Sequence, residues 1–463
     1  MPASDAGDGN RTVHGSGMDG GTGMTVLPKA FTERMSRQLG NELPDFLRAM
    51  EDDPVRGIRM NPMKPFPGME TYTSGERVPW AEDGYILPAD SQAGATVFHE
   101  AGAFYLQEPA AMLPAEVLNP IPGERILDLC AAPGGKSTQI GLKMRGEGLL
   151  ISNEPVPKRA KILSRNIERM GIPNSIVTCM YPAEIPQEWN ELFDGVLADA
   201  PCSGEGMFRR DPQTRGEWSP EMAAGCAKRQ LEILEEAARF VRPGGRLVYS
   251  TCTYNPEENE ETVEHCLQRH PEFETEPFRL QGAEGKNGMM LCLPHRVRGE
   301  GQFTALMRKK GGCTSVKLSV PFAVPDRKEK NLLAETIPGI PEPNAVFGNR
   351  LIRVPECPGM KGVRVLRAGL QIAEIRGKNA FPDHAAALGF PGNRGIRTEE
   401  TGPEAAAAYI AGNEIPGDAK GWILVTYHGL VLGWGKGSGG SIKNHYPKGL
   451  RKDRILTETD TER

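Results

Sequence analysis

Short apolar runs alternate with amphipathic stretches between Gly123 and about Phe273. This alternation is typical of a parallel, doubly wound sheet, in which a helix follows each strand and covers one face. The apolar runs predict strands at Arg125–Leu129, Leu149–Asn153, Ser175–Thr178, Gly195–Ala198 and Arg246–Thr251. The middle of the chain is therefore expected to be an α/β domain.

Two helices are indicated by their first turns. Ser219 and Pro220 have the form of an N-cap followed by proline at the first helical position, and Pro243-Gly244-Gly245 ends the pattern. Asn255-Pro256-Glu257-Glu258 has a similar form, with Glu258 as the capping glutamate. We expect a second helix to open at this motif.

The two flanks have other patterns. The first 25 residues are rich in Gly, Asp and Ser and almost without apolar side chains, so a disordered tail is predicted. From Leu27 to about Glu100, a helical pattern followed by a strand-like run at 56–61 predicts a small α+β module. Beyond residue 300, β-rich modules joined by a Pro-rich stretch near 320–345 are predicted from strand patterns at Phe303–Met307, Val363–Leu366, Trp422–Tyr427 and Leu430–Trp434.

Composition sets the broad class. The chain has 463 residues, of which 38% are apolar, a length that suits roughly two to four packed domains. No apolar run approaches the roughly 18–20 residues of a membrane span, and the start lacks a signal-peptide pattern, so we expect a cytoplasmic protein. The nine cysteines form no Cys-x-x-Cys pair and no disulfide framework, so reduced thiols and no bound metal are expected.

The net charge of -5 is unevenly distributed along the chain. Residues 301–463 hold 24 Lys and Arg against 16 Asp and Glu, whereas residues 1–300 hold 31 against 44. The basic part ends in residues 443–452, with Tyr446 interleaved among the cations. This excess indicates either a polyanionic partner or an unevenly charged, solvated surface.

The first predicted strand leads into a loop of small residues, from Asp128 to Ser137, that opens a helix. Glycines let a ligand approach the backbone, and the free N–H groups of a helix start attract a negative group. Glu154 follows after about 20 residues, at the end of the second strand, where nucleoside sites hold a ribose hydroxyl. Gly-Gly-Lys-Ser also suggests an ATPase phosphate loop, but that motif needs a glycine where this chain has Cys130.

Two thiols and a carboxylate follow the last two predicted strands. Asp199 and Cys202 come after the fourth strand, and Cys252 comes after the fifth. Ligands bind at this edge of an open α/β sheet, where the carboxyl ends of the strands meet. A single cysteine there is more often a small buried apolar residue, but a pair in loops beyond strand ends indicates chemistry. Methylation of carbon 5 of a pyrimidine needs a thiolate to attack carbon 6 first, and a second group to release the product.

These motifs resemble the Nop/Sun family of RNA 5-methylcytosine methyltransferases. The most specific are the loop 128–136, Asp-Ala-Pro-Cys-Ser-Gly (199–204) and Ser-Thr-Cys-Thr-Tyr-Asn-Pro-Glu-Glu-Asn-Glu (250–260). Residues 56–64 and 105–109 are similar to the family's N-terminal module and to its entry into the catalytic domain. Residues 363–388 and 443–451 resemble the C-terminal part of the branch that acts on bacterial small-subunit ribosomal RNA.

The resemblance implies a Rossmann-like methyltransferase sheet with an N-terminal α+β module and a β-rich, PUA-like C-terminal region. The domains that it implies are a tail (1–25), an N-terminal RNA-binding module (26–100), a catalytic domain (101–310), a C-terminal extension (311–390) and a PUA-like RNA-binding domain (391–463). It also implies S-adenosylmethionine as cofactor and a monomeric enzyme whose partner is RNA, above all small-subunit ribosomal RNA.

Residue roles are implied in the same way. Cys252 would be the nucleophile, Cys202 would assist release, and Asp199 would hydrogen-bond the flipped cytosine. The cofactor would contact Cys130, Ala131, Ala132, Pro133, Gly134, Gly135, Lys136, Glu154, Tyr181 and Asp199, with Glu154 on the ribose. Tyr181 aligns with an acid or amide that meets the adenine in the family, so either its ring and backbone groups hold the adenine or the loop is shifted.

Two other interpretations stay open. The substrate could be transfer RNA, because the same catalytic edge serves either RNA. The chain could also be a catalytically silent RNA-binding assembly factor, which would keep the fold and the basic C-terminal part but would not need both thiols.

Overall fold

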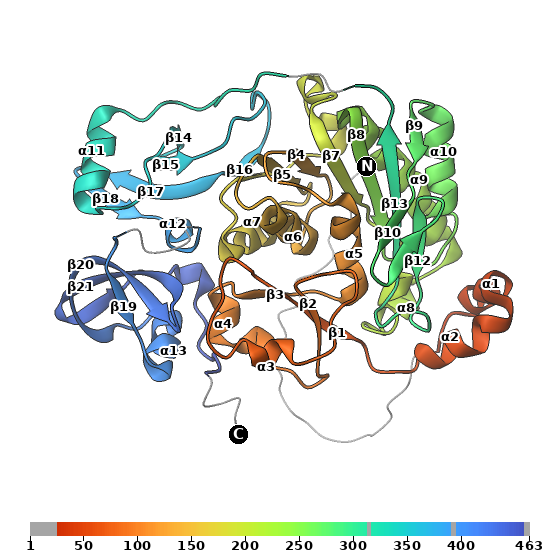
Figure 1. Ribbon diagram of the computed structural model, residues 1–463, viewed down its shortest axis with the longest axis horizontal. Helices are drawn as coiled ribbons and strands as arrows, with labels where there is room; N and C mark the ends of the chain where they lie inside the picture. The colour runs from red at the N-terminus through yellow and green to blue at the C-terminus, as the bar shows by residue number, and fades with distance from the viewer. Residues whose placement is uncertain (1–25, 313–315, 390–394, 458–463) are drawn as a thin grey trace.

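The computed structural model describes residues 26–312, 316–389 and 395–457 (Figure 1). The predicted disordered tail, residues 1–25, lies outside the described residues. Within the described ranges, no helix is both long and apolar enough to cross a membrane.

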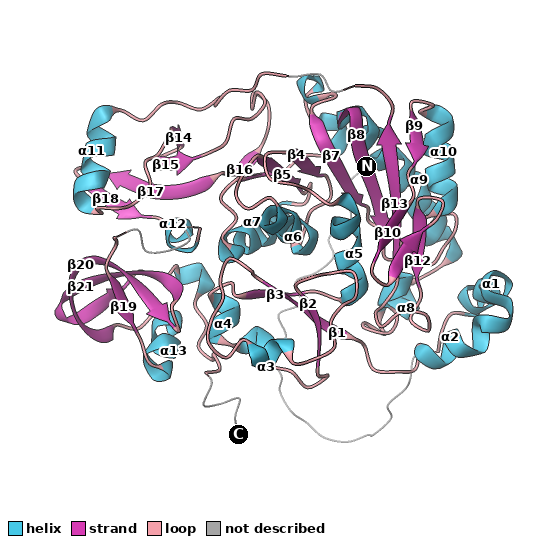
Figure 2. Ribbon diagram, in the orientation of Figure 1, coloured by secondary structure: helices cyan, strands magenta, loops and turns pink. Residues whose placement is uncertain are grey.

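A nine-stranded sheet occupies the centre of the described chain (Figure 2). Its five middle strands, β8, β7, β4, β5 and β6, are parallel, and the outer strands β13, β12, β9 and β16 are antiparallel to their neighbours. The order is β12 (Met289–Cys292), β13 (Gln302–Lys309), β8 (Val241–Thr251), β7 (Phe193–Asp199), β4 (Arg125–Asp128), β5 (Leu149–Asn153), β6 (Ser175–Thr178) and β16 (Val365–Ala368), with β9 (Phe273–Thr275) paired to β13.

Helices cover both faces of this sheet, as the alternating pattern predicts. One face carries α5 (Pro109–Leu118), α6 (Gly135–Lys143) and α7 (Pro157–Met170), which bury Leu113, Ile140 and Leu163 against it. The other face carries α9 (Pro220–Phe240) and α10 (Glu260–Arg269), which bury Leu234 and Val263. Each strand therefore has apolar neighbours on both sides, which is why the strands are near-continuous apolar runs.

The N-terminal part has two pieces. Helices α1 (Lys29–Leu39) and α2 (Leu43–Ala49) pack Phe31 and Phe46 against Tyr254 of the central α/β domain. A three-stranded sheet of β2 (Gly84–Leu87), β1 (Arg56–Met60) and β3 (Phe104–Leu106) follows, with the short helices α3 (Glu70–Thr73) and α4 (Val97–Glu100).

The C-terminal part has two small sheets. One is formed by β14 (Ala345–Phe347), β15 (Arg350–Arg353), β17 (Leu370–Arg376) and β18 (Asn379–Pro382), and the other by β19 (Thr398–Glu400), β20 (Ile415–Tyr427) and β21 (Leu430–Asn444). Helices α11 (Arg327–Thr336), α12 (His384–Leu388) and α13 (Pro403–Ala411) accompany them. The remaining elements are β10 (Phe278–Leu280), β11 (Ala283–Gly285) and α8 (Thr214–Glu217).

The N-terminal module and the C-terminal sheet share one apolar core. Ile58, Phe98 and Phe104 belong to the same buried cluster as Tyr427 and Ile442. The N-terminal module and the last sheet therefore meet beside the central sheet, and the blue strand β19 lies next to α4 in Figure 1.

Several expectations differ from the structure. The strand at Phe303–Met307 belongs to the central sheet as part of β13, not to a C-terminal module. The strand expected at Val363–Leu366 is β16, which adds an edge to the catalytic sheet at β6. The Pro-rich stretch 320–345 contains α11, whose N-cap Asp326 and Glu329 form a capping box. Strand pairing between distant segments is set by tertiary packing, which a local pattern does not report.

The predicted start of the helix at Asn255 is also wrong. Asn255 caps only a turn, through its Oδ1 and the N–H of Glu257 (3.2 Å), and α10 begins at Glu260. Glu258 does not cap the helix, because its carboxylate is used by another loop, described below.

Candidate active site

The carboxyl ends of the parallel strands surround two hollows in the described structure. The large hollow, of about 580 Å³, lies between the ends of β5 and β7 and helix α9. The small hollow, of about 290 Å³, lies between the loop after β4, the end of β3 and the start of β13. Both are lined by Cys130, Ala132, Asp199, Ala200 and Cys252. The two hollows thus meet at Asp199 and Cys252.

The two cysteines predicted to carry chemistry are in contact. Their sulfur atoms lie 3.1 Å apart, and the backbone N–H of Cys252 donates to Sγ of Cys202 at 3.3 Å. Cys252 lines both hollows, whereas Cys202 lines only the large one. The hydrogen bond to Cys252 and burial raise the pKa of Cys202 well above its ordinary value. Cys202 is therefore a protonated thiol at neutral pH.

Glu258 holds the two cysteine loops together. It is fully buried, and its carboxylate accepts the backbone N–H of Ser203 at 2.9 Å, the Ser203 hydroxyl, and Nε2 of Gln230 at 2.9 Å. The Ser203 hydroxyl also lies 2.9 Å from that of Thr253, the residue after Cys252. The loop carrying Cys202 is thus fixed to the segment that follows Cys252.

Glu205 adds a second connection to the same loop. Its carboxylate accepts Nη1 and Nη2 of Arg34, at 2.7 and 2.6 Å, and the backbone N–H of Tyr254 at 3.1 Å. Trp218 donates its indole N–H to the same carboxylate at 3.0 Å. Because Arg34 is on α1, the N-terminal helices reach the back of both cysteine loops.

Asp199 is held by three side chains. Its Oδ2 accepts Nζ of Lys136 at 2.8 Å, and its Oδ1 accepts the Ser250 hydroxyl at 2.6 Å and Nε2 of Gln302 at 3.4 Å. Burial would lower the pKa of Lys136, but the neighbouring Asp199 carboxylate outweighs it and raises that pKa above its ordinary value. Lys136 and Asp199 thus form a fixed ion pair on the wall of the small hollow.

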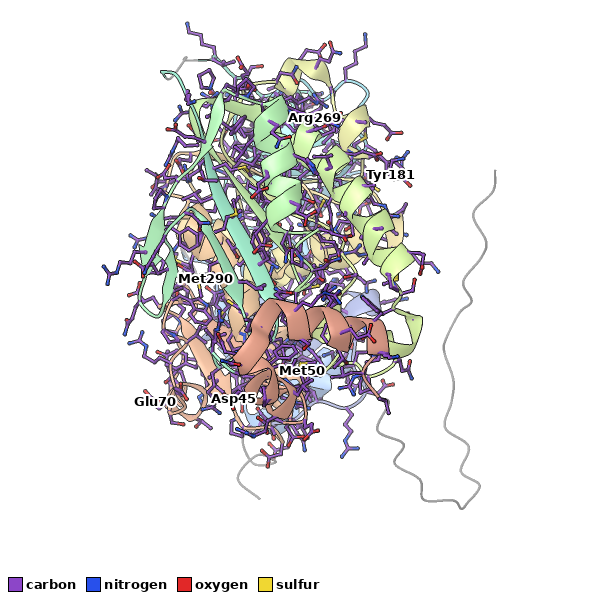
Figure 3. The ribbon with its side chains drawn as sticks, turned by 90° about the vertical axis from the view of Figure 1, so that its right-hand side faces the viewer. Asp45, Met50, Glu70, Tyr181, Arg269 and Met290 are labelled. Atoms are coloured by element: carbon purple, nitrogen blue, oxygen red, sulfur yellow. The ribbon has the colours of Figure 1, made fainter. Side chains whose placement is uncertain are left out.

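The large hollow has the features of a nucleoside site. Glu154 is 2% exposed, its Oε1 accepts the N–H of Val156 at 3.0 Å, and its Oε2 lies 3.5 Å from Arg159. Arg159 also donates to the carbonyl of Ala132 at 2.9 Å, which connects Glu154 to the loop after β4. Tyr181 lines the hollow at its mouth and is 61% exposed (Figure 3).

Helix α6 begins at the wall of the small hollow, which Gly135 and Lys136 line. Gly134 precedes it with φ 116°, a left-handed conformation that favours glycine. The first N–H groups of a helix have no partner inside the helix, so they can bind a negative group. Asp128 accepts the Ser137 hydroxyl at 2.6 Å, and burial raises the pKa of its carboxyl to about 7.

The structure brings nearly all of the predicted site residues together. Glu154, Tyr181 and Cys202 line the large hollow, and Ala131, Pro133, Gly135 and Lys136 line the small one. Gly134 lines neither, and it makes the turn instead. The side chain of Lys136 faces Asp199, although the sequence placed it among the cofactor contacts.

Sequence reasoning did not find Glu258, Glu205, Ser250 and Gln302 as site residues. Glu258 and Ser250 belong to the motif at residues 250–260, where the local pattern predicts only a helix cap for Glu258 and a strand end for Ser250. Gln302 and Glu205 carry no local signal, because their partners are distant in sequence.

Comparisons with known proteins agree on one family. The family described as 16S rRNA methyltransferase RsmB/F matches residues 115–308. The N-terminal domain of 16S rRNA methyltransferase RsmF matches residues 27–109, and the methyltransferase RsmF PUA domain matches residues 398–452.

Individual relatives span most of the chain. Ribosomal RNA small subunit methyltransferase F of Shewanella amazonensis is 33% identical over 82% of this chain and 87% of its own length. The protein of the same name from Aliivibrio fischeri is 31% identical over 93% of this chain and 98% of its own. Among solved structures, a methyltransferase homolog protein from Pyrococcus horikoshii is 28% identical, with a TM-score of 0.53 over 61% of this chain and 95% of that one.

Proposed function

The chain belongs to the RsmB/F family of 16S rRNA methyltransferases, and from this premise we propose that it methylates carbon 5 of a cytosine in RNA through a covalent cysteine adduct. The observation that carries the proposal is the pair of sulfur atoms 3.1 Å apart where the two hollows meet. A methyl donor in the large hollow and a base in the small one would meet at Cys252, which lines both.

The large hollow fits the cofactor of this family, S-adenosylmethionine, which supplies the methyl group when bound. Glu154 would hold the ribose hydroxyls, because its buried carboxylate is already oriented by Val156 and Arg159. Of the loop after β4, Cys130 and Ala132 line this hollow and would hold the charged tail, which would extend toward the N–H groups at the start of α6 beside the small hollow. Tyr181 and the neighbouring Pro182 would cover the adenine at the mouth.

The small hollow would hold the target base. Cys252 lines this hollow and Cys202 does not, so Cys252 is the sulfur that can reach carbon 6. As a thiolate it would bond to carbon 6, which shifts the electron pair of the 5,6 double bond into the bond between carbons 4 and 5 and places charge on the ring nitrogen. Carbon 5 would then bond to the methyl group as the bond from that group to the donor's sulfonium sulfur breaks.

Release of the methylated base reverses the addition of Cys252 to carbon 6. Loss of the carbon 5 proton to solvent water would restore the 5,6 double bond as the bond from carbon 6 to Sγ of Cys252 breaks, and Cys252 would leave as a thiolate. Cys202, 3.1 Å away, is placed to assist this step and, as a protonated thiol, does not compete for carbon 6.

Asp199 would orient the base. Its carboxylate accepts hydrogen bonds, so it suits the exocyclic amino group of cytosine, and Lys136 would balance charge as the ring nitrogen changes its electron density. A base must leave its stack to enter this hollow, so the substrate is an exposed or flipped nucleotide.

Small-subunit ribosomal RNA is the substrate that we propose, because the relatives that match most of the chain carry that substrate in their names. Transfer RNA is the alternative. A catalytically silent assembly factor is disfavoured, because such a protein would not need two thiols in contact between two hollows.

Bisulfite sequencing of RNA from a strain that lacks this gene, compared with its parent, tests the proposal. We expect one protected cytosine of the small-subunit RNA to become convertible in the deletion strain and to be restored by the wild-type gene. Restoration by Cys252→Ala, or an unchanged pattern in the deletion strain, would contradict it.

A further inference from the structure

A third hollow continues the small hollow away from Asp199. This outer hollow, of about 430 Å³, shares Leu106, Gln107, Glu108 and Arg210 with the small hollow. It extends along the N-terminal module to Arg56, Ser91 and Asp53. Together the two hollows form a groove that leads from Cys252 to the surface of the N-terminal module.

The walls of this groove are fixed by a buried ion pair and its hydrogen bonds to the backbone. Arg209 donates Nε to Glu300 at 2.8 Å and Nη1 to the carbonyl of Ala49 at 2.9 Å. Glu300 also accepts the backbone N–H of Val55 at 2.9 Å, at the entry to β1. The segment after the Cys202 loop and the edge of the N-terminal module are therefore fixed to each other, so the groove is preformed.

Arg210 stands at the junction of the two hollows. It follows the anchored Arg209, its side chain is exposed, and it makes no hydrogen bond or ion pair with the described residues. Arg56, also exposed, uses one N–H for the carbonyl of Ser91 at 3.1 Å and keeps its other donors free within the described chain. Two cations that face an open groove suit a phosphate backbone.

Leu106 gives the groove an apolar surface between these cations. It is 38% exposed at the end of β3, where it borders both hollows. An exposed apolar side chain beside free guanidinium groups suits a nucleotide, which has a flat apolar base and a charged phosphate. Glu108 is buried, and the N–H groups of Ala110, Ala111 and Glu300 that its carboxylate accepts partly offset its charge.

We propose that this groove binds the nucleotide adjacent to the target cytosine, with Arg210 on its phosphate and Leu106 against its base. The inference rests on the proposed function, because it takes the small hollow as the site of the target base. Asp53, the exposed acid of the outer hollow, would then accept a hydrogen bond from an amino group of that base.

The test pairs one protein variant with one RNA modification. The probe is an RNA fragment that contains the cytosine found by bisulfite sequencing. The phosphates on either side of the two nucleotides next to this cytosine are replaced, one at a time, by a neutral methylphosphonate. Dissociation constants are measured by filter binding for the full-length wild type, Arg210→Ala and Arg210→Lys. Arg279→Ala, an exposed arginine on β10 outside the groove, is the matched control.

We expect Arg210→Ala to weaken binding about tenfold, and Arg210→Lys to weaken it less because its charge is kept. At one position, the methylphosphonate should weaken binding to the wild type by a similar factor. The same RNA should bind Arg210→Ala no more weakly than the unmodified RNA does, because the contact is already lost. Arg279→Ala should respond to the methylphosphonate as the wild type does. If the losses from Arg210→Ala and from the methylphosphonate added at every position, or if Arg210→Ala bound the RNA as the wild type does, the inference would be overturned and the proposed function would stand. A wild-type protein that forms no 5-methylcytidine in this RNA would overturn the proposed function and the inference with it.

Discussion

At the scale of single residues, the site depends on side chains whose orientation is fixed before any ligand binds. Asp199 has three partners, Glu154 has two, and the two thiols contact each other. Such preorganisation lets a polar group act without first rearranging. The residue that most directly tests the cofactor assignment is Glu154.

Glu154→Ala should weaken binding of S-adenosylmethionine at least tenfold, about 1.4 kcal/mol, because two ribose hydroxyls would lose a charged acceptor in a site shielded from water. Isothermal titration calorimetry on the purified protein measures this change. Glu188→Ala, which removes an exposed carboxylate outside the hollow, is the control and should bind as the wild type does. Equal affinity in Glu154→Ala would remove the ribose role.

At the scale of elements, the two cysteines are held in place by loops more than by strands. The strands bring Cys202 and Cys252 to one edge, but Glu258 and Glu205 set the distance between the loops that carry them. Glu258 connects the loop after β7 to the segment after β8, and Glu205 connects both to α1. The 3.1 Å distance between the sulfur atoms should therefore be sensitive to replacement of Glu258.

Glu258→Ala would leave the buried N–H of Ser203 without its acceptor, whereas the Ser203 hydroxyl keeps Thr253 and Nε2 of Gln230 keeps the carbonyl of Pro201. We expect the free energy of unfolding to fall by about 1–3 kcal/mol, since a buried donor without a partner costs about that much. Methylation should slow as the Cys202 loop shifts, while the affinity for S-adenosylmethionine stays unchanged.

The matched control is Glu257→Ala, the exposed carboxylate one position earlier in the same motif. Thermal unfolding, single-turnover methylation and calorimetry should give wild-type values for this variant. If both variants behaved alike, Glu258 would have no special part in holding the loop.

The sequence predicts elements better than it predicts their partners. The strands at 149–153 and 175–178 have the expected bounds, because buried parallel strands are continuous apolar runs. The roles of β13 and β16 in the sheet and of Glu258 in the site did not follow from local patterns. Each depends on contacts between segments far apart in the chain, which periodicity and capping rules do not contain.

At the scale of the whole molecule, the basic C-terminal part has a more limited binding surface than its charge suggests. Tyr446 is 3% exposed and packs against His384 and Tyr409, so it is not available to stack on a base. Lys452 is paired with Glu100 of the N-terminal module. The exposed cations of the last sheet and the turn after it, Lys436, Lys443 and Lys448, are without an ion pair to the described residues.

Replacing Lys436 and Lys443 together with alanine should weaken RNA binding and flatten its salt dependence. Each lost phosphate contact lowers the magnitude of the slope of log K against log salt by roughly 0.7–0.9. The slope of the double variant should therefore be smaller in magnitude by about 1.4–1.8. Filter binding over a salt series measures this slope. The double variant Arg279→Ala with Lys286→Ala, exposed cations near the β10–β11 hairpin, should keep the wild-type slope. An equal slope in both would mean that the basic surface is only solvated charge.

The most direct test of the covalent mechanism is denaturing gel electrophoresis of each cysteine variant after incubation with substrate RNA and S-adenosylmethionine. Cys202→Ala keeps the attacking sulfur but releases the product slowly, so a slowly migrating protein–RNA band should accumulate. Cys252→Ala has no nucleophile, so no band should form and methylation should be lost. A band from Cys252→Ala alone would reverse the two roles, and two active variants without any band would contradict the covalent mechanism.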